Sequence, residues 1–515
     1  MKKIFTILLL LPCLFLHAQK NRLLEPSFWQ ESPDLGAIKT EINKGSSPSQ
    51  LNRMSMDPVA MAINGQAPFE SIEYLLSQPG NQVDKLTHDG RTYLHLAASR
   101  GNVQVMELLL KKGAKANVQD SHGSTPLTFA AGGGQQNTRI YDLLIASGVD
   151  LKKEVNPESA NVLLLAIAND KSFALTDYFI GKGLSMNSVD ASGINAFGYA
   201  AKAGNIELLK AVMQKGVKPD QNAMLMAVQG GGRRGGVSAG LPFYQYLESV
   251  NVKTASTTKA GENVLHFLVR KQGQNDIIQY FLAKGVNVNQ ADEDGNTVFM
   301  NAALANRDST VVSLLLPYVK DINLRNQKGI SALAMAVRGN SPELVSFLIS
   351  KGADVETLDK EGNNLAYYVI ESYRPALNNG FGGQGPMAGE GNRPANGPRP
   401  DDLETKFAIL QKAGLVVGAP QANGNTLYHL AILKNDVTLL KRLQPFNVDV
   451  NFKNKEGLTA LHKAALIAKD DTILQYLLSI GANKDLVTTY KETAFDLATE
   501  NESLTKNNIS INFLK

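Results

Sequence analysis

The pattern in this chain closest to a catalytic motif is Gly236-Val237-Ser238-Ala239-Gly240, which fits the Gly-x-Ser-x-Gly sequence of a nucleophile elbow. In such an elbow a β-strand delivers the serine onto a sharp turn into a helix, and a histidine and an acidic residue activate its hydroxyl. Here a Gly- and Arg-rich stretch precedes the motif, and Pro242 follows it at once. We therefore expect no catalysis at Ser238. Two arginines, Arg233 and Arg234, are too few for an RNA-binding Arg-Gly tract.

The seven histidines are the next candidates, as bases or metal ligands. Four of them end the same short element, which reads Thr-x-Leu-His in two of its copies; they are His95, His266, His429 and His462. Only the last two fall in neighbouring copies. The chain contains no His-Glu-x-x-His, Cys-x-x-Cys or phosphate-binding loop. The sequence therefore predicts no catalytic residue, no cofactor and no metal site.

The only cysteine, Cys13, lies in an N-terminal stretch typical of a secretory signal peptide. Two lysines precede an apolar run of 13 residues from 4 to 16, and Ala18 stands before Gln19. The run is shorter than the roughly 20 residues that a membrane-spanning helix needs. We expect cleavage after Ala18, which leaves a mature chain without disulfides. The alternatives are a membrane anchor and a lipoprotein at Cys13, where Pro12 is a poor fit to a lipobox.

The charge balance argues against nucleic acid or an anionic membrane as the main partner. The chain has 52 basic and 48 acidic residues, and loss of two lysines with the signal leaves 50 against 48, a net charge of +2. Such near-neutrality gives little long-range attraction for polyanions. No later segment is apolar for long enough to span a membrane. The short Lys-Lys signal is typical of bacteria and points to a periplasmic or secreted protein.

A period of about 33 residues organises almost the whole chain. Its opening glycines are spaced by 33, 70, 68, 34, 34, 33, 62 and 33 residues, where 62 is one period plus an insertion of 29. A fixed period of this length predicts a solenoid, in which each unit buries its apolar face against copies of itself. The glycines are Gly90, Gly123, Gly193, Gly261, Gly295, Gly329, Gly362, Gly424 and Gly457.

The repeating unit resembles the ankyrin repeat over roughly residues 35–500. The clearest copy carries the family's signature in Thr92 to Ala98, Leu108 to Ala114 and the Asn/Asp-rich end at 117–120. Eleven of thirteen units keep the small residue that lets neighbouring helix pairs approach closely, and Leu268 and Val369 replace it in the others. The eleven are Ala62, Ala97, Ala130, Ala166, Ala200, Ala227, Ala302, Ala336, Ala431, Ala464 and Ala498.

The resemblance implies an all-α fold, an ankyrin-repeat solenoid of about 12–13 helix–turn–helix units with short hairpin fingers. The expected domains are a signal peptide at 1–18, an N-terminal capping segment at 19–54, repeats at 55–376, a disordered Gly/Pro/Asn-rich insertion at 377–402, repeats at 403–500 and a C-terminal capping tail at 501–515. The insertion is expected between the two helices of the tenth unit, either as a tolerated loop or as a partner-binding tether.

The resemblance also assigns the histidines. The four periodic ones are expected to be structural, because in ankyrin repeats this histidine bonds backbone groups between neighbouring units. His88 and His122 are expected at the tips of neighbouring hairpins, where they could approach within a repeat spacing of roughly 10 Å, too far for one metal without further ligands.

Ankyrin stacks usually bind partners through hairpin tips and the concave inner ends of the first helices. Six cations on that face would favour an acidic protein surface, although cations at helix ends can also simply offset the macrodipole. The row is mixed, since Leu304, Leu433 and Leu466 occupy equivalent positions. The inner candidates are Arg100, Lys202, Arg270, Lys271, Arg338 and Lys434, and the tip candidates are His88, Arg91, His122, Glu262, Asn296, Asn363 and Asn425.

Together these observations predict a non-catalytic protein–protein interaction scaffold of the bacterial envelope. The expected partner is another protein, with no nucleic acid, no cofactor and no integral membrane segment after signal cleavage. The alternative is a small-molecule or glycan binder, or a hydrolase, that uses the inserted Gly-rich loops. A purely structural role in the envelope overlaps with the first interpretation.

Overall fold

The computed structural model describes residues 21–230, 239–374 and 402–515. The predicted signal peptide, Ser238 and almost all of the predicted insertion lie outside these residues. The described chain forms two compact bodies. The first contains residues up to 227 together with 250–252, and the second contains residues 228–249 and 253–515.

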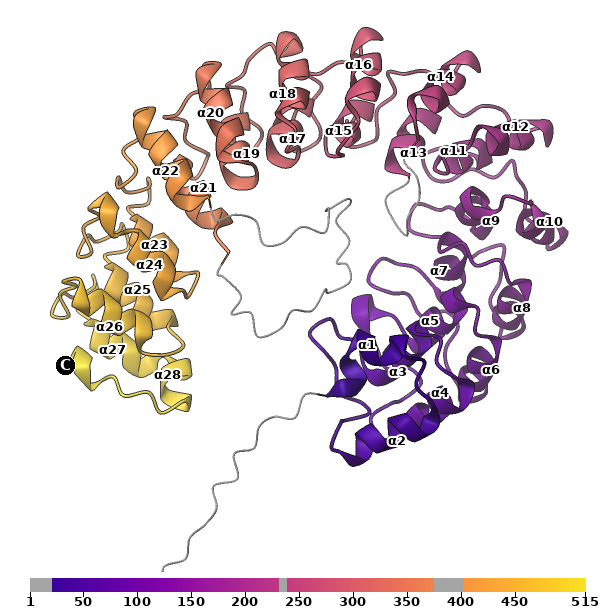
Figure 1. Ribbon diagram of the computed structural model, residues 1–515, viewed down its shortest axis with the longest axis horizontal. Helices are drawn as coiled ribbons and strands as arrows, with labels where there is room; N and C mark the ends of the chain where they lie inside the picture. Colours follow the sequence, from indigo (N-terminus) through magenta and orange to yellow (C-terminus); the bar gives the residue numbers. More distant parts are fainter. Residues whose placement is uncertain (1–20, 231–238, 375–401) are drawn as a thin grey trace, which may run out of the picture. The chain divides into compact units, whose positions relative to one another are not determined.

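Both bodies are built from consecutive pairs of short helices (Figure 1). Helix α13 (Ala223–Gln229) crosses the boundary between the bodies. The first body contains α1 (Pro26–Gln30), α2 (Leu35–Asn43), α3 (Pro58–Asn64), α4 (Phe69–Leu76), α5 (Tyr93–Arg100), α6 (Val103–Lys111), α7 (Pro126–Gly132), α8 (Thr138–Ala146), α9 (Val162–Ala166), α10 (Ala174–Gly181), α11 (Ala196–Ala201) and α12 (Ile206–Gln214).

The second body contains the remaining fifteen α-helices of the described chain. They are α14 (Leu241–Ser249), α15 (Val264–Leu268), α16 (Asn275–Ala283), α17 (Val298–Ala305), α18 (Ser309–Leu315), α19 (Ala332–Gly339), α20 (Pro342–Ser350), α21 (Leu365–Ser372), α22 (Leu403–Lys412), α23 (Leu427–Ile432), α24 (Val437–Arg442), α25 (Ala460–Ile467), α26 (Thr472–Ser479), α27 (Ala494–Glu500) and α28 (Glu502–Lys506).

From α3 to α28 the helices form thirteen pairs, numbered here as repeats 1 to 13, each with an inner first helix and an outer second helix. In the second body the inner helices α15, α17, α19, α21, α23, α25 and α27 pack each on the next, and most outer helices do the same. Helices α21 and α22 pack on each other as one repeat although thirty residues separate them. The predicted all-α ankyrin solenoid of about 12–13 units is therefore confirmed.

The predicted small residues explain how closely the inner helices pack. All eleven alanines, and the Leu268 and Val369 that replace them, are at most 2% exposed. Packing at this position buries each inner helix on both sides, so no single repeat can be removed without exposing its neighbours.

Short hairpins connect the repeats. Isolated antiparallel bridges, such as Ala291 with Thr297 and Arg325 with Ser331, close the fingers, and the described residues contain no longer strand. Successive tips are joined by backbone bonds, for example from the Gln327 amide to the Asp294 carbonyl at 2.9 Å. In the second body such bonds link the tips without a break from repeat 7 to repeat 12.

Both ends of the described chain are covered by apolar side chains. In the first body Trp29 is 4% exposed, and its indole Nε1–H donates to the Leu23 carbonyl at 2.9 Å. In the second body Leu504 and Leu514 are buried beside α27. Within the described residues, no helix is both long and apolar enough to cross a bilayer.

Candidate partner-binding surface

The four periodic histidines are buried in the stack and link neighbouring repeats by hydrogen bonds. Each lies in the first turn of an inner helix and is at most 1% exposed. In His462, Nδ1 accepts the Thr459 backbone N–H at 3.1 Å, and Nε2–H donates to the Leu486 carbonyl of the next repeat at 2.9 Å. His95, His266 and His429 make the same pair of bonds. The predicted structural role is confirmed.

This geometry fixes the charge state of these rings. An Nδ1 that accepts a backbone N–H cannot also carry a proton, so the neutral Nε2–H tautomer fits the site. Burial lowers the pKa of all four imidazoles below the ordinary value, and the carbonyl bonds oppose this only in part. These histidines are therefore not available as ligands or bases at the surface.

His88 and His122 lie within one repeat spacing of each other, as predicted. The Nε2 atom of each ring is 3.5 Å from the same oxygen, Oδ2 of Asp89, so the two rings are less than one repeat spacing apart. The reason is that Asp89, in a left-handed conformation at the tip, projects between them. Arg91 also contacts Asp89 at 3.1 Å and donates through Nε to Asp120 at 3.1 Å. In the described part of the chain, no group of three or more potential ligands has the arrangement for a metal ion.

Two of the predicted inner cations cap the preceding repeat. The Lys271 ammonium donates to the carbonyls of Val228 at 2.5 Å and Gly230 at 3.1 Å, and the Lys434 ammonium donates to the Glu371 carbonyl at 2.6 Å. These acceptors follow or end an inner helix, where carbonyls lack an intrahelical partner. Burial lowers the pKa of both lysines.

Other repeats of the second body use different residues for the same purpose. Lys406 comes from the outer helix α22, whereas three asparagines come from the turn after an inner helix. The buried side chains of Asn306, Asn340, Lys406 and Asn501 donate to carbonyls at the ends of α15, α17, α19 and α25, respectively. The sequence analysis missed this shared role, because the acceptors lie more than thirty residues away.

The remaining inner cations are also engaged. Arg270 pairs with Glu262 at 3.4 Å, which joins an inner candidate to a tip candidate, and Arg338 pairs with Glu371 at 2.9 Å. In the first body Arg100 donates to the Asn64 side chain at 3.2 Å, and the Lys202 ammonium lies 4.9 Å from the ring centre of Tyr199. Burial lowers the pKa of Lys202. The six cations therefore make contacts inside their own body.

The three candidate asparagines at the tips are used within the fingers. Asn363 is 4% exposed and donates to the Asp359 carboxylate at 3.0 Å. Asn296 and Asn425 accept from the side chains of Asn326 at 2.8 Å and Asn454 at 2.9 Å in the following repeat. The exposed residues of these tips are their neighbours, among them Glu293, Asp294, Lys328, Lys360, Glu361, Lys455 and Glu456.

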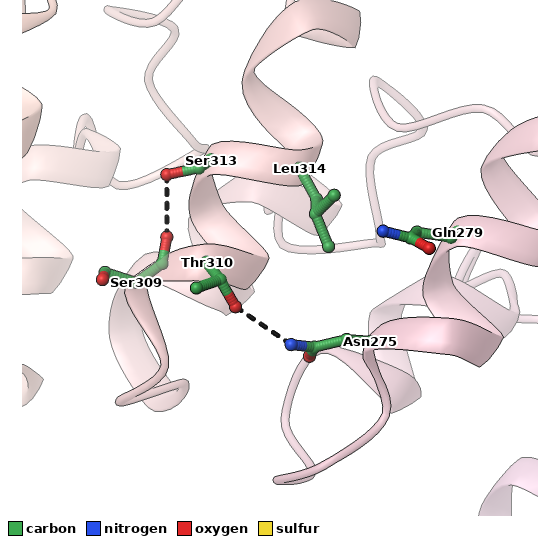
Figure 2. A pocket seen from close by; sticks show the side chains of 6 residues that line it. All are labelled: Asn275, Gln279, Ser309, Thr310, Ser313 and Leu314. Atoms are coloured by element: carbon green, nitrogen blue, oxygen red, sulfur yellow. Dashed lines mark hydrogen bonds between the residues drawn. The ribbon is translucent and has the colours of Figure 1, made fainter.

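A polar groove lies between the outer helices α16 and α18. It has a volume of about 430 Å³ and is lined by Asn275, Gln279, Ser309, Thr310, Ser313 and Leu314. Figure 2 shows that Asn275 is bonded to Thr310, that Ser313 is bonded back to the Ser309 carbonyl, and that Gln279 and Leu314 extend into the space between the helices. The lining contains no charged group and no histidine, so it offers no acid or base.

The inner face of repeats 11 and 12 differs from the rest of the second body. Leu433, Leu466 and Ile467 are 59%, 42% and 43% exposed at the ends of α23 and α25. Lys463 lies one turn before them on α25 and is half-buried. The sequence analysis had placed Leu433 and Leu466 in the inner row but had not selected them as contact residues. The available signal was the spacing of Lys463, Leu466 and Ile467, which brings them to one helix face.

Comparison with known proteins agrees with this architecture. The family model described as "Ankyrin repeats (3 copies)" matches residues 59–156, 242–323, 265–359, 299–377 and 424–511, which together are more than half of the chain. The chain belongs to the ankyrin-repeat family.

The relatives share the repeats within otherwise different proteins. The chain is 22% identical over 454 residues to the human transient receptor potential cation channel subfamily A member 1, covering 88% of this chain and 32% of the channel. It is 25% identical to alpha-latroinsectotoxin-Lt1a of Latrodectus tredecimguttatus, covering 55% of this chain and 20% of the toxin. It is 26% identical to the phosphocholine transferase AnkX of Legionella pneumophila, covering 38% and 19%. The chain thus spans less than a third of the length of these relatives.

Proposed function

We propose that this chain is an exported bacterial scaffold protein without enzymatic activity, which binds another protein through its inner-helix ends and hairpin tips. The observation that carries this proposal is that the side chains capable of acid–base or ligand chemistry are engaged in bonds within the stack. The four buried histidines and the inner cations bond within the stack, while the exposed surface consists of long runs of equivalent positions from successive repeats. Such surfaces suit recognition of extended protein partners.

The relatives support the same conclusion. Their names describe a channel, a toxin and a transferase, and the region they share with this chain is at most about a third of each. The common element is therefore the repeats, and ankyrin repeats generally serve as protein-binding scaffolds. The alternative of a small-molecule binder or hydrolase depends on Ser238 and the insertion, which lie outside the described residues.

The test is site-specific photo-crosslinking of the full-length protein in its native cell. A benzoylphenylalanine is placed at Ala305 on an inner-helix end, at Lys360 on a tip, or at Ser346 on the outer helix α20; all three are exposed. We expect one dominant crosslinked protein from the inner or tip positions and none from Ser346. Equal crosslinking from all three positions would contradict binding through the inner and tip surfaces.

The proposed export is tested separately by N-terminal sequencing of the protein purified from envelope and periplasmic fractions. We expect a mature chain that begins at Gln19, since cleavage is proposed after Ala18. A purified chain that retains Met1 and occurs in the cytoplasmic fraction would overturn the export proposal without touching the scaffold proposal.

A further inference from the structure

Four residues of repeats 11 and 12 form one surface, called here the α23–α25 patch: Leu433, Lys463, Leu466 and Ile467. The last three are spaced i, i+3 and i+4 on α25 and therefore share one face of that helix. Leu433 follows α23 at the position equivalent to Leu466, thirty-three residues earlier, and α23 packs on α25. The patch is thus continuous across two neighbouring inner helices.

The aliphatic part of the patch is unusual for its position. At the ends of α15, α17, α19, α21 and α25, an asparagine or lysine from the next repeat donates to the terminal carbonyls. At the end of α23 the equivalent region carries exposed leucine and isoleucine side chains, which can make no such bond. Large aliphatic side chains that gather on an exposed face mark a contact surface more often than isolated ones do.

Lys463 adds a charge that the stack leaves without an ion pair. It precedes the periodic Ala464, where the neighbouring repeats carry Leu430 and Leu497. In the described ranges, no carboxylate lies within ion-pairing distance of its ammonium, and Glu456 acts on it only from farther away. Burial lowers its pKa. A carboxylate from a partner would supply the charge-assisted hydrogen bond that this half-buried ammonium lacks.

We propose that the α23–α25 patch binds a protein segment that presents aliphatic side chains beside a carboxylate, such as an acidic amphipathic helix. The aliphatic residues of the segment cover Leu433, Leu466 and Ile467, and its carboxylate reaches Lys463. Exposed Glu500 holds the position equivalent to Leu466 in the next repeat, so the acidic group must approach from the Lys463 side. This inference rests on the proposed scaffold function and names the partner class and the site.

The test uses the full chain as bait for a phage library of random peptides, followed by affinity measurements with the selected synthetic peptides. We expect selected sequences to combine Leu, Ile or Phe with Asp or Glu. Lys463→Glu and the double variant Leu433→Ser/Leu466→Ser should each weaken binding at least about tenfold, as for central contact residues. Lys463→Glu should also select basic peptides in a second panning, which a merely structural effect would not produce.

Matched controls remove the same chemistry elsewhere. Lys412→Glu changes an exposed lysine at the end of the outer helix α22, and Val416→Ser changes a 70% exposed aliphatic side chain outside the patch. Neither should change peptide affinity. All substituted side chains are exposed or half-buried, and unchanged helical circular dichroism and thermal unfolding show that the variants are folded.

Three outcomes would overturn the inference. Selected peptides that bind all variants equally would place the binding site elsewhere and leave the scaffold proposal intact. Binding of anionic phosphatidylglycerol vesicles that depends on Lys463, with no peptide selected, would assign the patch to lipid. Absence of any selected peptide, with photo-crosslinking to a partner still present, would restrict binding to other surfaces, whereas loss of both would reject the scaffold proposal itself.

Discussion

The inner-helix ends of repeats 7 to 10 and of repeats 11 and 12 belong to the same body and follow the same sequence period, yet they differ in the side chains that they expose. In the first region polar side chains bond to the preceding repeat, as Asn340 does with the Ala303 and Asn306 carbonyls. In the second, Lys434 makes the same kind of bond to the Glu371 carbonyl, but Leu433 beside it and Leu466 and Ile467 of repeat 12 are exposed. The difference shows that a position at the end of an inner helix is available either to stabilise the stack or to contact a partner, because one side chain seldom does both.

The largest effect on stability is expected from removing one of the polar side chains that bond to the preceding repeat in the first region. In Asn340→Ala the Ala303 and Asn306 carbonyls lose the hydrogen bonds that the buried Asn340 amide donates to them, at 3.0 and 2.7 Å. We expect the free energy of unfolding to fall by about 2–3 kcal/mol, because buried carbonyls are left without a partner. Chemical denaturation followed by circular dichroism measures the change.

The matched variant is Leu433→Ala in the second region, which should alter the free energy of unfolding by no more than about 0.5 kcal/mol because the side chain is exposed. Equal destabilisation by the two substitutions would mean that the two regions do not differ in the way described.

A smaller effect on stability is expected from replacing one of the four buried histidines, and this effect should depend on pH. His429 links repeat 11 to repeat 12 through the Leu458 carbonyl at 2.9 Å, in the region where α23 has aliphatic residues at its end. Replacing it by Phe should lower the free energy of unfolding by about 1–2 kcal/mol near neutral pH, since a buried carbonyl and a helix N–H lose their partner. Hydrogen exchange should locate the loosening at the α23–α25 contact.

The pH dependence follows from the lowered pKa of the four buried imidazoles. Above the unfolded pKa of about 6.5, folded and unfolded chains are both neutral at these rings and the stability contribution is fully present. As the pH falls below that value the unfolded chain binds protons first, so stability is lost down to the folded pKa. The wild type should therefore lose stability more steeply than His429→Phe on acidification, and identical slopes would contradict the assignment.

The sequence predicts much of this architecture, because its signals are local and repeated. The alanines, the first-turn histidines and the hairpin punctuation recur every 33 residues or so, and each reports a contact made by every repeat. The hydrogen-bond acceptors of Lys271, Lys406 and Lys434 could not be predicted in this way. They are main-chain carbonyls of the preceding repeat, and for Lys406 the insertion places the acceptor 69 residues away. Because a main-chain carbonyl has no signature in the sequence, the sequence indicates only that Lys271 and Lys434 belong to a surface row.

The exposure of Leu466 and Ile467 was equally hard to predict. Aliphatic residues on an inner helix are buried at most positions, as Leu430 and Leu461 are. Whether a leucine at the last turn is covered depends on the side chain that the next repeat places over it. That is a property of two repeats together, whereas composition and period describe each one alone.

The smallest effect on stability is expected from a substitution that removes only an exposed ion pair. Arg338 and Glu371 form a two-bond ion pair at 2.9 and 3.3 Å with both side chains partly exposed. Exposed pairs of this kind contribute about 0.2–1 kcal/mol, so Arg338→Gln should change the free energy of unfolding by no more than that. Because the arginine is engaged within repeats 9 and 10, the substitution should leave the affinity of peptides selected on the α23–α25 patch unchanged.

The triple variant Arg270→Glu/Lys271→Glu/Arg338→Glu extends this contrast to three of the six cations in the predicted basic row. Its Lys271 component removes a donor from the Val228 and Gly230 carbonyls, so this variant should lose more stability than Arg338→Gln and still bind patch-selected peptides. Loss of peptide binding while circular dichroism shows intact helices would return the recognition role to the cations. Retention of binding would mean that these charges hold the stack together and that recognition belongs to the aliphatic ends beside Lys463.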